Sequence, residues 1–363
     1  MGVMLCIFVA GLGAQSKLKL DTGKEIFQAG CVSCHGPDGK GQTDNIAGFE
    51  KPATFPDFSD CPTSTPEANL QWKSIITNGG TARGFSEIMP SFKDQLTPDQ
   101  IDKVVGYLRS LCTEPKWPIG NFNLPRPLIT EKAFPENETV LTTSIDKTSG
   151  EVVQELVFEK RFGARTNFET RIPLTFVRNS FGTWNGGVGD VSAEVKRVLF
   201  ANPKSGSMLS ASGEVNFSTG NAQNGTGSGV TILEPYLAYA QILPRSSFLQ
   251  FQTGVEIPTH RDSGVVTAAF WRTAVGKSFY QGGGLGRMWT PMVEMIADRD
   301  YFTGSTTNWN VVPEMQVTLS KRQHIRANIG WSIPTNNRSS RSSTLMFYLL
   351  WDWFDGGLRD GWK

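Results

Sequence analysis

The chain has 363 residues, with 35 lysines and arginines against 34 aspartates and glutamates, so its formal net charge is +1. This balance, without a basic stretch interleaved with aromatic residues, argues against a nucleic-acid partner. Only three histidines are present, and no Ser/His/Asp or paired-carboxylate arrangement supports hydrolytic catalysis. No apolar run reaches the roughly 20 residues that a transmembrane helix needs.

The first 15 residues are expected to be a secretory signal peptide. Residues 3–12 form an apolar run that is too short for a membrane span. Small residues follow this run, as at a cleavage site, although the usual basic residues before it are missing. Such a signal places the mature protein in an oxidising compartment.

A short helix is predicted over residues 21–28, and the motif C-V-S-C-H follows at 31–35. Two cysteines at this spacing with a histidine directly after them are the attachment signature of a c-type haem. Cys31 and Cys34 would form thioethers with the haem, and His35 would ligate the iron. The cysteines could alternatively bind zinc or perform thiol redox chemistry.

With its flanks, this segment resembles class I cytochrome c domains, in which C-x-x-C-H-G-x-x-G-x-G follows an N-terminal helix. The resemblance implies an all-α domain over residues 16–113 with one covalent haem c. Met89 is the only methionine near the haem motif, and it stands in M-P-S-F, which is similar to the M-P-x-F loop that carries the axial methionine in this family. Ligation by His35 and Met89 would raise the reduction potential relative to two histidines. Otherwise Met89 fills space in the core.

Two further helices are predicted in this domain. One is expected to begin with Thr65 as its N-cap and to end before Gly79. The other is expected behind Thr97, which forms a capping-box pattern with Gln100 ahead of an apolar helical stripe. The first and last helices cross in cytochromes c, and the resemblance therefore implies a contact between Phe27 and the last helix.

The five cysteines of the chain fall into three groups. Cys6 lies in the signal peptide, Cys31 and Cys34 lie in the haem motif, and Cys61 and Cys112 remain. A disulfide between the remaining two is expected in an oxidising compartment, and two free thiols are the alternative.

The composition changes after the first domain. Residues 114–137 carry five prolines and are predicted to form a stiff, extended linker. From residue 138 to 354, apolar and polar residues alternate with period two, as in Leu249 and Phe251 against Gln250 and Gln252. Turn clusters separate these segments, which predicts about twelve antiparallel strands.

Two architectures produce this alternation: a soluble β-sandwich and a transmembrane barrel whose apolar face contacts lipid. Strands of roughly nine to twelve residues and tryptophans near the strand ends favour the barrel. Charged residues in the middle of the polar face also favour it, because a lumen tolerates them. These residues are Glu194, Lys196, Glu214, Arg272, Glu294 and Glu314. We therefore predict an all-β, outer-membrane-type barrel over 138–354 and a tail over 355–363.

Residues 161–165 and 187–191 resemble the outer-membrane barrel family associated with phenol-degradation pathways. In layout, the two halves resemble fused porin-cytochromes of the iron-oxidase type, with a shorter barrel. This resemblance implies electron transfer at or across a bacterial outer membrane, with the haem domain periplasmic or inside the barrel and with Fe(II) oxidation as an open question. The expected partners are outer-membrane lipid, periplasmic redox carriers and an extracellular or periplasmic electron donor or acceptor.

Two other hypotheses stay open on the sequence. The barrel could be a solute-transport pore with the cytochrome domain as a sensor or docking module. The β domain could instead be a soluble docking domain of a periplasmic electron-transfer protein. His260 and His324 are interpreted as structural, and Gly282–Gly286 as a loop between strands, because no Lys-Ser pair or helix follows as in a phosphate loop.

Overall fold

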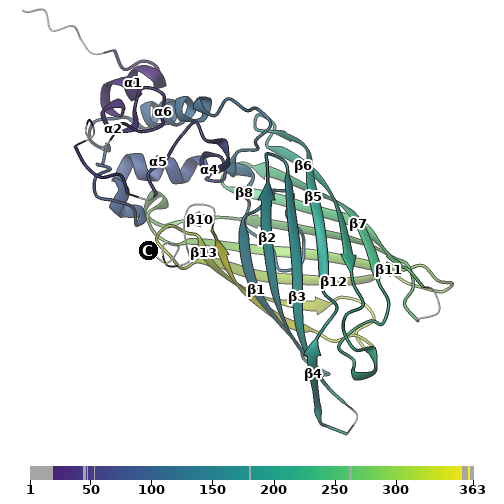
Figure 1. Cartoon of the computed structure of the whole chain (residues 1–363). Coiled ribbons are helices and arrows are strands. Elements are labelled where there is room, and N and C mark those ends of the chain that lie inside the picture. Colours follow the sequence, from purple (N-terminus) through teal and green to yellow (C-terminus); the bar gives the residue numbers. More distant parts are fainter. Residues whose placement is uncertain are drawn as a thin grey trace, which may run out of the picture.

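The chain folds into a helical domain and a closed antiparallel β-barrel, and the helical domain lies against one end of the barrel (Figure 1). The predicted fold class is therefore confirmed. The expected signal peptide and nearly all of the C-terminal tail lie outside the described residues. Among the described helices, none is long and apolar enough to cross a membrane. This computed structural model describes residues 19–43, 46, 48–52, 54–179, 181–260, 264–353 and 359.

Capping boxes begin the first and the last helix of the helical domain. The Thr22 hydroxyl accepts from the backbone N–H of Glu25, and Thr97 accepts from that of Gln100, as the sequence predicted for the last helix. Before the barrel, the described helices and 3-10 turns are α1 (Gly23–Gly30), α2 (Val32–His35), α4 (Cys61–Ser64), α5 (Asn69–Asn78), η1 (Gly80–Arg83), α6 (Pro98–Leu111) and η2 (Gly120–Phe122). Two further 3-10 turns, η3 (Ala222–Asn224) and η5 (Gln281–Gly284), lie between strands of the barrel.

The helix predicted to begin at Thr65 begins later, at Asn69, so that prediction was wrong in its start. Thr65 instead ends α4, where its hydroxyl donates to the carbonyl of Cys61 over 2.6 Å. Because that hydroxyl bonds to the preceding turn, it does not cap the first turn of a following helix. Gly79 ends α5 as predicted, with a φ of 82° that favours glycine.

Helices α1 and α6 cross at close range. The rings of Phe27 and Tyr107 lie 5.3 Å apart between centroids, which confirms the predicted contact of Phe27 with the last helix. At the crossing, a Cβ on Gly23 would lie 2.0 Å from the carbonyl oxygen of Lys103. The buried core around this crossing comprises Ile26, Phe27, Phe58, Trp72, Ile76, Ile101, Val104, Val105 and Leu108.

Gly23→Ala is expected to destabilise the helical domain by about 1–3 kcal/mol, because α1 has to move away from α6. Gly106→Ala is the matched control, since a Cβ there meets no atom within 4 Å. Alanine at Gly106 should stabilise α6 by up to about 1 kcal/mol. Urea unfolding, followed by tryptophan fluorescence, measures both effects. The midpoint of Gly23→Ala should fall and that of Gly106→Ala should rise. A midpoint for Gly23→Ala at or above that of the unchanged protein would contradict the close crossing.

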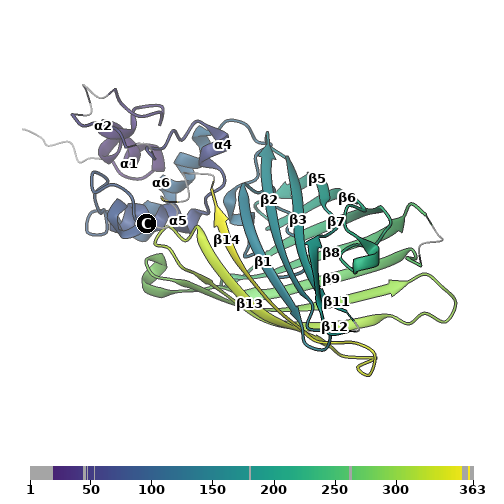
Figure 2. The same cartoon turned by 60° about the horizontal axis from the view of Figure 1, so that its bottom comes forward.

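Twelve strands close the barrel, because β14 pairs with β1 and β9 pairs with β11 (Figure 2). The predicted number of strands is confirmed, and two short strands, β4 and β10, pair with β3 and β11 outside this ring. The strands are β1 (Glu138–Asp146), β2 (Val152–Phe162), β3 (Thr166–Arg178), β4 (Trp184–Val188), β5 (Ser192–Asn202), β6 (Ser207–Asn216), β7 (Ile232–Leu243), β8 (Ser247–Pro258), β9 (Ala268–Lys277), β10 (Phe279–Tyr280), β11 (Met288–Asp300), β12 (Asn308–Thr318), β13 (Ile325–Pro334) and β14 (Thr344–Asp352).

The two faces of the barrel wall differ in chemistry. Apolar side chains such as Leu141, Ile172 and Val293 are exposed on the outside. Of the six charged residues predicted for the polar face, five are buried, and the sixth, Arg272, is partly buried. This alternation agrees with the predicted barrel, whose polar face lines the lumen.

The lumen is not polar throughout, which corrects the expectation of a polar lining. On one side, inward-facing Met208, Ala238 and Phe248 are buried against Phe122 and Phe134. The latter two belong to the segment predicted to be a linker. Residues 114–137 do connect the two domains, but residues 122–136 also lie inside the barrel, where they supply apolar partners for this part of the wall.

Candidate functional site

The helical domain contains a partly open cavity of about 840 Å³. Cys31, Cys34 and His35 reach it from α2 and the turn before it, and Met89 reaches it from the loop between η1 and α6. The structure therefore brings the four residues singled out in the sequence around one space. Much of the remaining wall is apolar or aromatic and includes Phe27, Phe55, Phe58, Trp72, Ile76, Val104 and Leu108.

The environment of His35 suits a metal ligand. Burial lowers the pKa of His35 to about 4, so the imidazole is neutral at neutral pH. Its ring lies against Phe55 and Phe58, with centroid distances of 5.0 and 5.1 Å. Within the described part of the chain, its buried Nδ1 has no hydrogen-bond partner. A neutral imidazole is the form that ligates a metal.

The environment of the two cysteines does not suit zinc. Burial raises the pKa of the Cys31 thiol to about 11, with a smaller contribution from Cys34, whereas zinc binding requires thiolates. Neither cysteine belongs to a group of three or more metal-ligating side chains in the described ranges. Both are free of disulfides. A Cys31 thiol whose pKa is raised by burial, beside a large and mainly apolar cavity, fits the attachment of haem better than a zinc site.

Backbone hydrogen bonds fix the loop that carries Met89. The N–H of Gly80 donates to the carbonyl of Met89 over 3.0 Å, and the N–H of Phe92 donates to the carbonyl of Ile76 over 3.0 Å. The loop is thus attached to the end of α5 and the residues after it at Met89 itself and three residues later, at Phe92. A Cβ on Gly80 would lie 2.2 Å from the carbonyl oxygen of Ser86, so this close return requires glycine.

The remaining two cysteines of the domain form a disulfide. Cys61 and Cys112 are bonded, with their Cα atoms 5.2 Å apart, and the expected pairing is confirmed. The bond joins α4 to the end of α6, and Thr63 and Ser64 next to Cys61 line the cavity. The disulfide therefore ties one wall of the cavity to the last helix.

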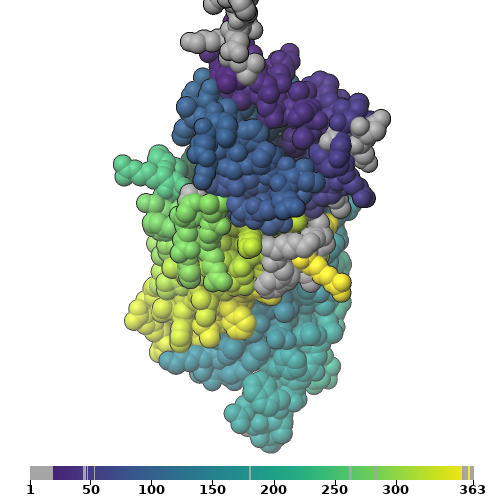
Figure 3. Space-filling model, turned by 90° about the vertical axis from the view of Figure 1, so that its left-hand side faces the viewer, coloured from purple at the N-terminus to yellow at the C-terminus, as the bar shows by residue number. Residues whose placement is uncertain are grey.

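One wall of the cavity is shared with the interface to the barrel. Glu67 lines the cavity, and its Oε1 lies 2.8 Å from Nε2 of His324 in the turn before β13. Phe85 also lines the cavity, and the guanidinium of Arg322 lies 4.3 Å from its ring centroid. Figure 3 shows the helical domain packed directly on the strands and turns at this end of the barrel.

Arg83 connects the two domains through two different turns of the barrel. Its guanidinium is buried and donates to the carbonyls of Gly284 and Arg322, each over 2.9 Å. His324, interpreted from the sequence as structural, therefore takes part in docking the helical domain. Residues 282–286, interpreted as a loop between strands, also take part, and their first residues belong to the 3-10 turn η5. No local pattern predicts this interface, because its partners are separated by about 200 residues or more.

The comparisons with known proteins concern the two domains separately. Residues 20–112 match the family described as Cytochrome c, which implies covalently bound haem c. No curated protein matches the chain. The NanC porin covers 59% of this chain and 99% of its own at 11% identity and a TM-score of 0.43. The KdgM porin in complex with disordered oligogalacturonate covers 60% and 99% at 7% identity and a TM-score of 0.40.

An outer membrane channel from Pseudomonas putida F1 covers 63% of this chain and 100% of its own, at 13% identity and a TM-score of 0.39. The barrel itself is defined by the closed strand pairing described above. The match over residues 20–112 identifies the helical domain as a cytochrome c domain, and the chain is therefore a fusion of that domain with a closed twelve-stranded β-barrel.

Proposed function

We propose that the protein is a single-haem electron carrier anchored in a bacterial outer membrane, where it exchanges electrons with periplasmic redox carriers. The observation that supports this function is the convergence of Cys31, Cys34, His35 and Met89 on one cavity, in a domain docked on the mouth of a barrel. Bound haem would supply one-electron iron chemistry.

Each of the four residues has a distinct role in this proposal. The thiols of Cys31 and Cys34 would attach the haem covalently through thioethers. His35, kept neutral by burial, would ligate the iron through a ring nitrogen, and Met89 would ligate it through its thioether sulfur. The apolar wall of the cavity excludes water and favours the neutral ligand pair.

The outer surface of the barrel supports a membrane location. Apolar side chains cover it, and tryptophans lie near both rims, as in the aromatic girdles of outer-membrane barrels. Trp289 lies near the rim that carries the helical domain. Trp271 and Trp309 pack edge to face at the opposite rim, with centroids 4.8 Å apart.

The lengths of the connections support a periplasmic haem domain. At the docked end, residues 163–165, 203–206 and 244–246 form short turns, and the longer connection 278–287 contacts the helical domain through Gly284. At the opposite end, residues 217–231 and 259–267 form longer loops. Outer-membrane barrels have short periplasmic turns and long extracellular loops.

Exchange on one side of the membrane fits this geometry better than a transmembrane conduit. A haem at one mouth leaves a hydrocarbon core of about 30 Å between itself and the opposite side. Residues 122–136 occupy the lumen between the two sides. We therefore place both electron donor and electron acceptor on the periplasmic side.

Met89→Ala is expected to abolish the long-wavelength sulfur–iron charge-transfer band while the haem stays covalently bound. The reduction potential should fall, because a methionine ligand raises it. Absorption spectra and a redox titration of the purified protein measure both effects. Met295→Ala, which removes an exposed methionine on the outside of β11, is the control and should leave both unchanged. An unaltered spectrum in Met89→Ala would exclude Met89 as a ligand.

A further inference from the structure

The lumen segment, residues 122–136, contacts the barrel wall on opposite sides. The guanidinium of Arg126 pairs with Glu138 of β1 over 2.7 Å, whereas the carbonyl of Pro125 accepts from Gln250 of β8, six strands further around the twelve-strand ring, over 2.8 Å. Since its partners surround it, the segment crosses the middle of the lumen. Hydrogen bonds or ion pairs join it to β1, β2, β3, β6, β8, β11, β12, β13 and β14.

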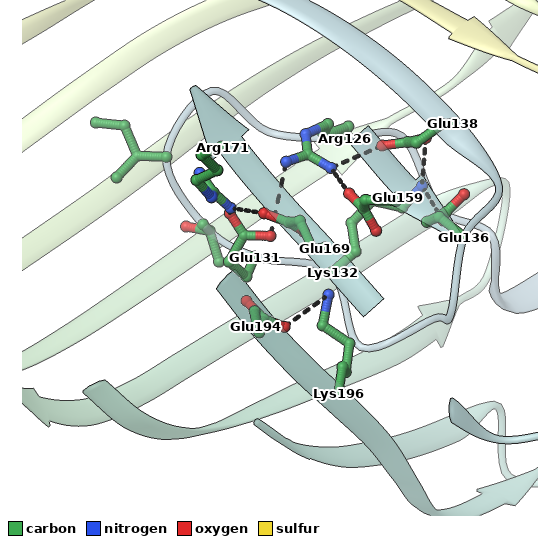
Figure 4. Close-up of polar contacts among 12 residues, drawn as sticks. Arg126, Glu131, Lys132, Glu136, Glu138, Glu159, Glu169, Arg171, Glu194 and Lys196 are labelled. Carbon is green, nitrogen blue, oxygen red and sulfur yellow. Dashed lines mark hydrogen bonds and ion pairs between the residues drawn. The ribbon is translucent and has the colours of Figure 1, made fainter. Parts of the chain in front are cut away.

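Arg126 is the centre of the polar contacts of this segment (Figure 4). Its Nη1 lies 2.7 Å from Glu138 Oε1 and also pairs with Glu159, and both carboxylates are buried. Its carbonyl accepts from the hydroxyl of Tyr348 over 2.6 Å. Removing one partner of a buried ion pair leaves the other uncompensated, which is costly. Arg126 therefore holds the segment against β1, β2 and β14.

A carboxylate of β11 and a guanidinium of β3 fix the tip of the lumen segment, residues 126–131. Oxygen atoms of Glu294 accept from the N–H groups of Ile129 and Thr130, over 3.0 and 2.6 Å. Glu131 Oε1 lies 2.6 Å from Nη2 of Arg171. Buried backbone N–H groups need such partners, and the wall supplies them from its mid-strand charges. The tip is thus bound to β3 and β11 as well.

On the side of β6 and β8 the side-chain contacts are mainly apolar. Phe122, Leu124 and Phe134 pack against inward-facing residues of the wall, including Met208 and Phe248. Polar contacts with one part of the wall and mainly apolar contacts with another thus hold the segment across the lumen.

A polar cavity of about 330 Å³ lies against the tip of the lumen segment. The segment contributes Arg126 and Glu131 to it. The wall contributes side chains of both charges, namely Arg171, Glu214, Glu234 and Arg272. A lining with both signs of charge does not exclude either anions or cations, so it suits small polar solutes and ions of either sign.

We propose that the barrel is a channel for small polar solutes and that the lumen segment keeps it closed. Arg126 is the principal latch, the residue whose ion pairs with the wall hold the segment in place. This function is separate from electron transfer. The segment is continuous with η2 before it and β1 after it. Only its middle part, Arg126–Glu131, has to leave the wall for the two sides of the lumen to connect.

Conductance of the full-length protein in planar lipid bilayers, with potassium chloride on both sides, tests this proposal. Replacing Arg126–Glu131 by glycine and serine at equal length keeps the apolar anchors and removes the tip. The open probability of this variant should rise about tenfold or more over that of the unchanged protein, the change that a loss of about 1.4 kcal/mol in the closed state gives. Arg126→Gln should shift it in the same direction by a smaller factor.

The matched control is Arg197→Gln, because Arg197 is exposed on the outside of β5 and donates to Thr166 Oγ1 over 2.9 Å. It should leave the conductance unchanged. Heat-modifiable migration on a gel verifies the fold of each variant. If the tip variant folds but shows no conductance, the lumen is not a channel. If Arg126→Gln and the unchanged protein have the same conductance, Arg126 does not hold the lumen segment in its closed position. The haem spectrum is read independently, so failure here leaves the electron-carrier proposal intact.

Discussion

A barrel without covalently bound haem is the expected product when Cys31 and Cys34 are both replaced by alanine. Thioethers require the two thiols, so attachment should be lost completely. The contacts that dock the helical domain, through Glu67 and Arg83, do not involve these cysteines. The variant should therefore still reach the membrane. Peroxidase staining of haem on a denaturing gel, together with detergent extraction of the membrane fraction, measures the two results.

The matched control removes the other cysteine pair of the same domain. Cys61→Ala with Cys112→Ala breaks the disulfide, which should cost about 2–4 kcal/mol of stability. Haem staining should persist, because neither residue belongs to the attachment motif. Haem staining that survives in the Cys31 and Cys34 variant would contradict covalent attachment at this motif. Loss of staining in both variants would show that the stain reports the stability of the domain instead.

Features that depend on neighbours in the sequence were predictable. The capping box at Thr97 and the glycine that ends α5 are encoded within a few residues, and both were predicted. The alternation along the strands identified twelve strands because side chains of a strand point to opposite faces at every second residue. The predicted helix start at Thr65 was wrong because a threonine before a proline is typical of an N-cap, whereas this hydroxyl donates to the carbonyl of Cys61, four residues earlier.

The position of residues 122–136 was not predictable in the same way. Prolines in this segment indicate an extended backbone but name no partner. The partners of its N–H groups, Glu294 and Glu314, lie more than 160 residues away in the chain. Both were noted as charges in the middle of strands, but a water-filled lumen and a lumen filled by protein explain such charges equally well. Only the fold distinguishes these two explanations.

Val293→Arg is expected to weaken folding into lipid bilayers by about 2–4 kcal/mol, the cost of an arginine on the lipid face near the midplane of the bilayer. Val293 lies in the middle of β11 with its side chain outward and 50% exposed. On a soluble sheet the same arginine would be solvated, and its effect would stay within about 0.5 kcal/mol. The size of the effect therefore separates a lipid-embedded barrel from a soluble docking domain.

Urea titration of folding into phospholipid vesicles gives this free energy. Thr303→Arg adds the same charge in the exposed turn that follows β11 and should have little effect. The adjacent Glu294 points into the lumen and keeps its hydrogen bonds to the lumen segment in both variants, so the difference reports the outer face alone. Equal stability of the two arginine variants would mean that water covers the outer face. In that case the cytochrome c domain would belong to a soluble protein, and neither the membrane anchor nor the closed channel would hold.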